Sequence, residues 1–313
     1  MSEQEHGREL PGFIEPAEAT YYQRIVRSHY RGDGCIVDAG CFIGASTRAL
    51  SEGLPGLAEA QTDLRPIIAL DRFTVGDRYV GEYLAGLGLD IRYGESFLPA
   101  FLANMGDRIG HVEVRAGDLL QVGRIERPIE ILVVDLAKTA PLNAFVFNRW
   151  FPRLLPGHSL IVQQDFYSPT QPWIAVGMGC LLDYVSVEHD KVGESAIFRL
   201  ERPVPRDALH AATVGWDRPE GLWKLDRMIE VLGDQVAAPL RLMRAVTLHG
   251  LGKAPEARRA LEQELALHPT PTDAKWDKWL TAALVAVMPD IFDGHAMLGR
   301  LYWTHGAHRL GHG

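Results

Sequence analysis

The sequence predicts an α/β protein: a doubly wound, Rossmann-like sheet of seven mostly parallel strands with an antiparallel edge hairpin, followed by an α-helical C-terminal region. Two observations carry this prediction. Short runs rich in β-branched residues alternate with helical stretches, as in a parallel sheet connected by helices. The middle runs are almost entirely apolar, which is typical of strands that helices cover on both faces.

The elements follow in order along the chain. A polar lead-in carries one helix near residues 17–29. Seven strands are then predicted, over residues 35–40, 67–71, 111–115, 129–135, 159–163, 184–188 and 195–200. Residues 189–194 are rich in turn formers and predict a hairpin between the last two strands. The expected domains are an N-terminal helical lead-in over 1–34, a Rossmann-like domain over 35–202 and a helical region over 203–313.

The C-terminal region loses the strand signal from Leu222 onward and shows helical spacing only. Residues 241–269 resemble one tetratricopeptide-type hairpin, with small residues where two helices would cross and Pro269 after the second helix. Such arrays need about three repeats for stability, and only one is readable. A helical appendage is therefore favoured over a repeat array.

Composition narrows the class of protein. The chain has 313 residues and a formal net charge of −8, which disfavours a nucleic-acid partner. No apolar run reaches the roughly 18 residues that span a bilayer, and the first ten residues are polar. Three cysteines without a Cys-x-x-Cys pair fit a reducing compartment. We therefore expect a cytoplasmic protein with no membrane or nucleic-acid partner.

The strongest local signal follows the first predicted strand, where Asp38 precedes Gly40 and Gly44, and Ser46 begins a helix. Glycines allow a ligand to approach the backbone closely, and the free amides of a helix N-terminus lie beside it. The dinucleotide pattern Gly-x-Gly-x-x-Gly is absent, since Cys41, Phe42 and Ile43 separate the two glycines. An acid at this place favours a ligand with an amino group or a sulfonium over a pyrophosphate.

This acid-x-Gly-x-x-x-Gly motif resembles the first motif of the class I S-adenosylmethionine-dependent methyltransferases, and the resemblance covers about residues 30–200. It implies S-adenosylmethionine as the cofactor. Asp71 would accept hydrogen bonds from the ribose, and Asp118 would lie near the adenine. The implied cofactor-binding set is Asp38, Gly40, Phe42, Gly44, Ser46, Asp71, Asp118 and Asp135. Residues 71–94 lie at the same edge and could cover the cofactor or the acceptor.

The ends of the fourth and fifth predicted strands resemble those of the metal-dependent small-molecule and sugar O-methyltransferases. The resemblance implies Asp135 and Lys138 as catalytic residues and a Mg²⁺ site at Asp135, Gln164 and Asp165. A divalent cation with oxygen ligands would lower the pKa of an acceptor hydroxyl. Those families carry paired acids, or an acid and an asparagine, where this chain has Gln163-Gln164-Asp165. The sequence leaves open whether the metal site is intact, and whether Lys138 is a base or forms a salt bridge.

The leading hypothesis is an S-adenosylmethionine-dependent O-methyltransferase acting on a small-molecule or sugar hydroxyl, as in natural-product assembly. A second hypothesis is a non-catalytic protein of this fold that binds a protein partner, or a second copy of itself, through its C-terminal helices. A third, a nicotinamide-dependent oxidoreductase, is disfavoured by the glycine spacing and by Cys41-Phe42.

Overall fold

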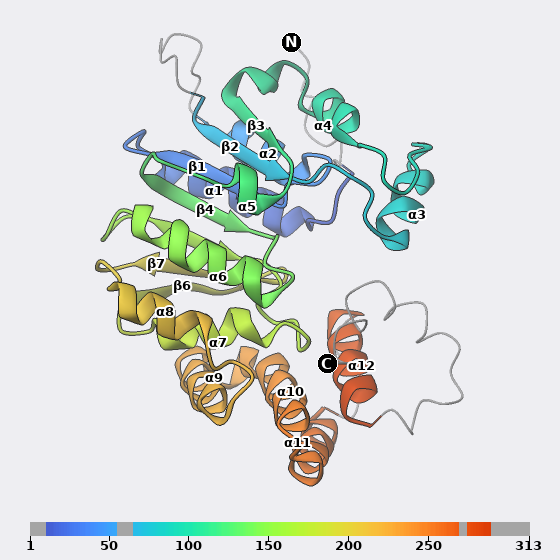
Figure 1. The fold of residues 1–313 in the computed structure, drawn as a ribbon, viewed down its shortest axis with the longest axis vertical. Helices are drawn as coiled ribbons and strands as arrows, with labels where there is room; N and C mark the ends of the chain where they lie inside the picture. Colours follow the sequence, from blue (N-terminus) through green and yellow to red (C-terminus); the bar gives the residue numbers. More distant parts are fainter. Residues whose placement is uncertain (1–10, 55–64, 269–273, 289–313) are drawn as a thin grey trace. The chain divides into compact units, whose positions relative to one another are not determined.

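The computed structural model describes residues 11–54, 65–268 and 274–288 (Figure 1). The polar first ten residues and Pro269 lie outside these ranges. No helix in the described part of the chain combines the length and hydrophobicity needed to cross a membrane.

Seven strands form one sheet in the order β3-β2-β1-β4-β5-β7-β6. β1 pairs in parallel with β2 and β4, β2 pairs in parallel with β3, and β6 pairs antiparallel with β7. The predicted fold class is confirmed. The strands are β1 (Cys35–Ala39), β2 (Ile67–Asp71), β3 (Val112–Ala116), β4 (Ile129–Val134), β5 (Leu160–Gln163), β6 (Val185–Val192) and β7 (Ser195–Leu200).

The helices divide between the sheet connections and the C-terminal region. Those up to β7 are α1 (Pro16–His29), α2 (Ala45–Gly53), α3 (Arg78–Gly86), α4 (Leu98–Met105), α5 (Leu119–Val122), α6 (Ala140–Arg149) and α7 (Pro172–Cys180), with 3-10 turns at Gly106–His111 and Phe151–Arg153. Those after β7 are α8 (Arg206–Thr213), α9 (Pro219–Leu232), α10 (Asp234–Gly250), α11 (Ala254–Leu267) and α12 (Ala274–Val287).

The chain separates into two compact units, and each is described by itself. The first holds residues 1–136 and 153–162, and the second holds residues 137–152 and 163–313. The predicted domain boundaries stay a prediction. Figure 1 shows the strands β3, β2, β1 and β4 of the first unit side by side. All residues of β1 and β4 are buried, so the core of this unit is formed around its central strands.

Parallel register places the ends of several strands at one edge of the first unit. Gly40 donates its backbone N–H to Leu70 at 2.8 Å, and Asp135 donates its N–H to Ala39 at 2.7 Å. Gly117 donates to the carbonyl of Asp71 at 3.0 Å. The segments that follow β1, β2, β3 and β4 therefore meet at the carboxyl edge of the strands, where ligands bind in open α/β sheets.

A buried acid fixes the opposite edge of the first unit. Glu130, the second residue of β4, is fully buried. Its carboxylate accepts the backbone N–H groups of Arg31 and Gly34, both at 2.7 Å, and lies 2.9 Å from Nε2 of His158. The His158 ring stacks on His29 at the end of α1, with ring centroids 4.3 Å apart. This cluster connects the α1–β1 turn and the turn before β5 to β4.

In the second unit, the edge hairpin is longer than predicted. β6 continues through Val192, and the turn consists of Gly193 and Glu194 rather than residues 189–194. The extension is mostly exposed and contains register shifts on both sides of His189, so it lacks the apolar alternation that identifies a strand in sequence. The predicted hairpin in the helical region is formed by α10 and α11, which turn at Leu251-Gly252-Lys253.

Candidate functional site

The loop after β1 has a backbone that requires glycine at two places. Gly40 and Gly44 have φ angles of +94° and +97°. A Cβ on Gly40 would lie 2.8 Å from the carbonyl group of Asp135, so this glycine also allows the loop to cross the end of β4. Gly44 is the N-cap of α2, as the sequence predicted for the turn before the helix. Between them Phe42 has a φ of +46°, a strained conformation for an aromatic residue.

Asp38 is the acid that this loop encloses. It is 1% exposed, and its Oδ2 accepts hydrogen bonds from the hydroxyls of Ser46 at 2.9 Å and Thr47 at 2.5 Å. Its Oδ1 is buried and has no hydrogen-bond partner. Burial raises the pKa of Asp38 to about 6, despite the two hydroxyl donors. A carboxylate oxygen without a donor is costly in the interior, and a cationic or amino-bearing ligand would satisfy it.

Asp71, at the end of β2, holds the glycine loop in place. Its Oδ2 accepts the backbone N–H of Phe42 at 2.9 Å, and its Oδ1 accepts that of Phe73 at 2.8 Å. Burial raises the pKa of Asp71, and these backbone donors oppose the shift. Each carboxylate oxygen has a second lone pair, so the side chain can still accept from a ligand hydroxyl.

Aromatic side chains gather around Phe42. The ring of Phe13 stacks on Phe42 with centroids 4.7 Å apart and contacts Tyr79 and Tyr83 of α3. The Tyr83 hydroxyl lies 2.8 Å from the backbone nitrogen of Gly12 and 2.9 Å from its carbonyl oxygen. The segment 71–94 thus forms, with the residues before α1, a partly exposed aromatic cover beside the glycine loop.

Asp118 and Asp135 occupy the same edge of the first unit but have different surroundings. Asp118 is exposed and caps the short helix α5 by accepting the backbone N–H of Leu120 at 2.9 Å. Asp135 is partly buried and directly follows β4. The structure therefore brings the predicted residues between Asp38 and Asp71 into one connected network and places these two acids at the edge beside it. Their ligand roles stay predictions.

The remaining predicted residues belong to the second unit. Lys138, whose side chain is 47% exposed, forms an ion pair with Oδ2 of Asp165, whose side chain is 16% exposed. Gln171, before α7, donates its Nε2 to the same oxygen at 3.4 Å. Burial would raise the pKa of Asp165, but Lys138, with smaller contributions from Lys278 and Gln171, lowers it. Gln164 is buried, and Asp165 has a φ of +56°, a conformation that Asp tolerates better than most residues.

Helix α12 adds a second ammonium group near Asp165. Lys278 pairs with both carboxylate oxygens of Glu194, at 3.0 and 3.2 Å. Burial opposes its charge, but Glu194 and Asp165 together raise the pKa of Lys278. Lys278 therefore interacts electrostatically with Asp165 and with Lys138.

These surroundings do not fit a divalent cation. Asp165 pairs with the ammonium group of Lys138 and accepts from the amide of Gln171, and its neighbour Gln164 is neutral. Within the described ranges, no group of three or more His, Cys, Asp or Glu side chains could hold a metal ion. Asp135 belongs to the first unit while Gln164 and Asp165 belong to the second, so the convergence of the three stays a prediction.

Sequence reasoning missed four contributors. Thr47 was visible beside Ser46, since two hydroxyls at a helix start suit a buried acid. Phe13 contacts Phe42, Gln171 contacts Asp165, and the charge of Lys278 acts on Asp165, and no local sequence pattern indicates any of the three.

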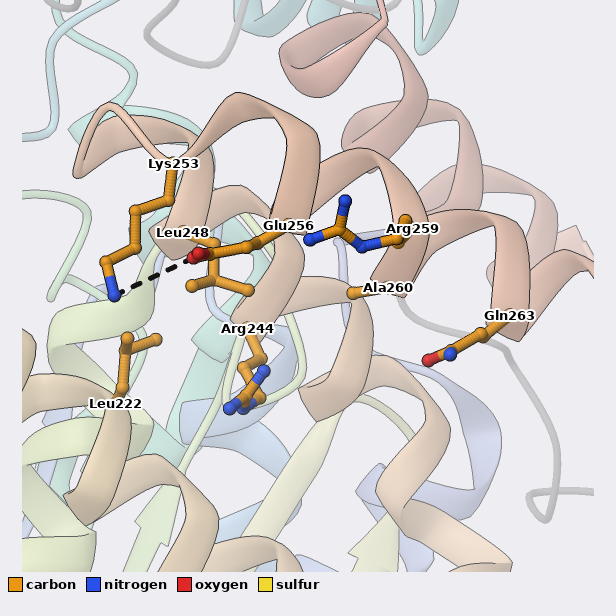
Figure 2. Close-up of a pocket in the computed structure, with 8 residues that line it drawn as sticks. All are labelled: Leu222, Arg244, Leu248, Lys253, Glu256, Arg259, Ala260 and Gln263. Atoms are coloured by element: carbon orange, nitrogen blue, oxygen red, sulfur yellow. Dashed lines mark ion pairs between the residues drawn. The ribbon is translucent and has the colours of Figure 1, made fainter.

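A separate pocket of about 450 Å³ lies among α9, α10 and α11 of the second unit (Figure 2). Arg244, Lys253 and Arg259 supply positive charge to its wall, and Figure 2 shows Glu256 turned toward Lys253. Arg244 is also paired with Asp226 at 2.7 Å. None of the predicted site residues lines this pocket. Its lining residues are Leu222, Arg244, Leu248, Lys253, Glu256, Arg259, Ala260 and Gln263.

No model of a protein family matches the chain, and no curated protein matches it. Among solved structures the chain is similar to the calicheamicin methyltransferase CalS11, at 20% identity over 58% of this chain and 76% of that chain, with a TM-score of 0.39. It is also similar to the apo structure of CalS11, described as a TDP-rhamnose 3'-O-methyltransferase, at 21% identity, the same coverage and a TM-score of 0.40.

Similarity of this extent adds nothing about activity to what the residues themselves indicate. The fold rests on the sheet itself: seven strands in this order, with an antiparallel strand between β5 and β6, form the Rossmann-like sheet expected from the resemblance to class I methyltransferases.

Proposed function

We propose that this chain is an S-adenosylmethionine-dependent methyltransferase. The observation that carries the proposal is the unpartnered, buried Oδ1 of Asp38 inside a glycine loop at the carboxyl edge of the sheet. An anionic acceptor without a donor suits the ammonium group of a bound amino acid better than it suits a phosphate. Asp71, at the end of the neighbouring strand, supplies carboxylate oxygens for vicinal hydroxyls of a ribose.

The residues of the first unit would hold the cofactor by distinct contacts. Asp38 would accept a hydrogen bond from its amino group, while Gly40, Phe42, Gly44 and Ser46 shape the loop around it. Asp71 would accept from the ribose, Asp118 would lie near the adenine, and Asp135 would complete the cofactor-binding set. When bound, S-adenosylmethionine supplies a methyl group on a positively charged sulfur. The protein then needs mainly to align an acceptor oxygen with that methyl group.

The acceptor proposed from the resemblance is a hydroxyl of a small molecule or sugar, as in natural-product assembly. Lys138 and Asp135 remain its proposed catalytic residues. Since Lys138 is paired with Asp165, it is held as an ammonium group, which suits positioning of an acceptor oxygen better than proton removal. Assistance by Mg²⁺ at Asp135, Gln164 and Asp165, which the resemblance implies, is left out of the proposal because Lys138 and Gln171 already occupy the Asp165 carboxylate.

Calorimetric titration with S-adenosylmethionine and S-adenosylhomocysteine tests the proposal directly. We expect one site per chain with a dissociation constant in the micromolar range, and a loss of affinity of at least about tenfold in Asp38→Ala, because a buried charged hydrogen bond contributes about 1.5–3 kcal/mol. Asp107→Asn, a change at an exposed aspartate of the same unit, is the matched control. Absence of binding to either compound would refute the proposal.

A second candidate function is binding of a protein partner through the C-terminal helices. The observation that favours it is the pocket of Figure 2, where three cationic side chains stand on an otherwise acidic protein. Its lining would suit a partner segment with carboxylate groups beside an apolar side chain. Arg259→Glu reverses one charge there, and Arg258→Glu is the matched control, since Arg258 pairs with Glu262 and does not line the pocket. Loss of the biological activity in Arg259→Glu but not in Asp38→Ala would favour this function over catalysis.

A further inference from the structure

The end of β5 is organised around one carboxylate and its hydrogen-bond donors. Lys138 reaches Asp165 from the segment that follows β4, and Gln171 reaches the same oxygen from the start of α7. Gln164 and Gln171 are both buried, and the Oε1 of Gln171 has no partner. Asp165 is thus held by an ammonium group and an amide, in the place where the resemblance predicted a metal ligand.

Helix α12 takes part in the same arrangement although it lies far along the chain. Trp279 is 2% exposed and packs against Tyr167, two residues after Asp165, with ring centroids 5.8 Å apart. The ammonium group of Lys191, in the edge hairpin, lies over the Trp279 ring, 5.2 Å from the ring centroid. These contacts fix α12 beside the β5–α7 segment, and the adjacent Lys278 brings its ammonium group into interaction with Asp165 and Lys138.

We propose that the acceptor half of this site works without a divalent cation, because Lys138 and Gln171 already occupy the Asp165 carboxylate. The inference rests on the proposed methyltransferase function. A metal ion bound to Asp165 would have to displace the ammonium of Lys138 and then remain next to that positive charge. Gln164 supplies no negative charge to offset that repulsion.

Helix α12 is also tied to the edge hairpin, because Lys278 pairs with Glu194 in the turn between β6 and β7. The charge of Lys278 acts on Asp165 from this place.

Mn²⁺ binding to the full-length chain, followed by electron paramagnetic resonance of the free ion, tests the inference without an acceptor. Wild type is expected to bind Mn²⁺ with a dissociation constant weaker than about 1 mM, the range of weak oxygen sites. Lys138→Gln exposes Asp165 and should strengthen binding by at least about tenfold, since one adjacent positive charge is removed. Lys278→Gln should strengthen it less, because Lys278 pairs first with Glu194.

Matched variants make the result interpretable. Lys253→Gln is the control for Lys138→Gln. The Lys253 side chain is equally exposed, at 47%, and also pairs with a carboxylate, but it lines the pocket of Figure 2. This variant should leave Mn²⁺ binding unchanged. Adding Asp165→Asn to Lys138→Gln should abolish the gain, and Asn accepts the backbone conformation at this position.

Micromolar binding of one Mn²⁺ to wild type that Asp165→Asn abolishes would overturn the inference. So would a Lys138→Gln variant that binds no better than wild type. S-adenosylhomocysteine binding, which involves residues of the first unit, is measured on the same samples. If wild type does not bind S-adenosylhomocysteine, the proposed function is refuted. The Mn²⁺ result tests only the inference about the acceptor half.

Discussion

Asp38 is subject to opposite demands from folding and from ligand binding. The glycine loop encloses its carboxylate. One carboxylate oxygen accepts hydrogen bonds from Ser46 and Thr47, and the other has no hydrogen-bond partner. Burial raises its pKa to about 6 from an ordinary value of 3.8. The ionised form that would hold an ammonium group is therefore the form that destabilises the ligand-free protein.

The first prediction concerns the pH dependence of stability in Asp38→Asn. Because the folded pKa lies above the unfolded one, the unfolded chain releases its proton first, and the contribution of Asp38 to stability falls as pH rises from about 4 to about 6. Over this window wild type should lose about 3 kcal/mol relative to Asp38→Asn, which is two pKa units at about 1.36 kcal/mol each. Urea unfolding of both proteins at pH 4 and pH 7 measures the difference.

The comparison of two pH values removes any constant effect of the substitution, such as an amide N–H left without a partner. Asp118→Asn is the control, since Asp118 is an exposed helix cap. Equal pH dependence in Asp38→Asn and wild type would show that Asp38 is not buried as a carboxylate.

At the scale of elements, Glu130 connects three segments of the first unit that are distant in sequence. Its carboxylate accepts from Arg31, Gly34 and His158, which fixes the turn into β1 and the turn into β5 on the start of β4. Burial works against its charge, but the His158 and backbone donors outweigh burial and lower the pKa of Glu130. A buried carboxylate with three donors is a point at which a single change affects several elements.

The second prediction is that Glu130→Gln destabilises the protein by about 3 kcal/mol at pH 7, since removal of one partner leaves the other buried groups poorly satisfied. In wild type the stabilisation from Glu130 is present above its unfolded pKa and is lost as pH falls through its lowered folded pKa. Denaturant unfolding measures both effects. Glu126→Gln, at an exposed glutamate that pairs with Arg153, should change stability by less than about 0.5 kcal/mol. A loss of equal size in the two variants would contradict the role given to Glu130.

The same elements show what the sequence could predict. The central strands were visible because strands covered on both faces need largely apolar runs, as in Ile129–Val134. Glu130, one acid within that run, was the visible sign of a buried cluster, and it was overlooked. The sequence predicted too early an end for β6, because an exposed edge strand lacks the apolar alternation that would mark its last residue. The contacts of Phe13 with Phe42, and of Lys278 with Glu194, depend on folding between distant segments and have no local signature.

At the scale of the whole molecule, the proposed functions divide between the two units. The residues proposed for the cofactor all belong to the first unit, whereas Lys138, Asp165 and Lys278 belong to the second. A ligand that binds only one folded unit stabilises that unit by mass action, independently of the other. Thermal unfolding with and without ligand therefore assigns the binding site to a part of the chain.

The third prediction is that S-adenosylhomocysteine raises the unfolding temperature of wild type. At about 100 times its dissociation constant the ligand contributes about 2.7 kcal/mol, which corresponds to a rise of about 5 °C or more for units of this size. Asp38→Asn should show at most about half of this rise, because an affinity at least about tenfold weaker leaves at most about 1.4 kcal/mol, while Lys138→Gln should show the same rise as wild type because it alters only the acceptor half. If calorimetry resolves two transitions, only the transition of the first unit should move. An undiminished rise in Asp38→Asn would separate the ligand from Asp38, and a rise that requires Lys138 would place the cofactor contacts in the wrong unit.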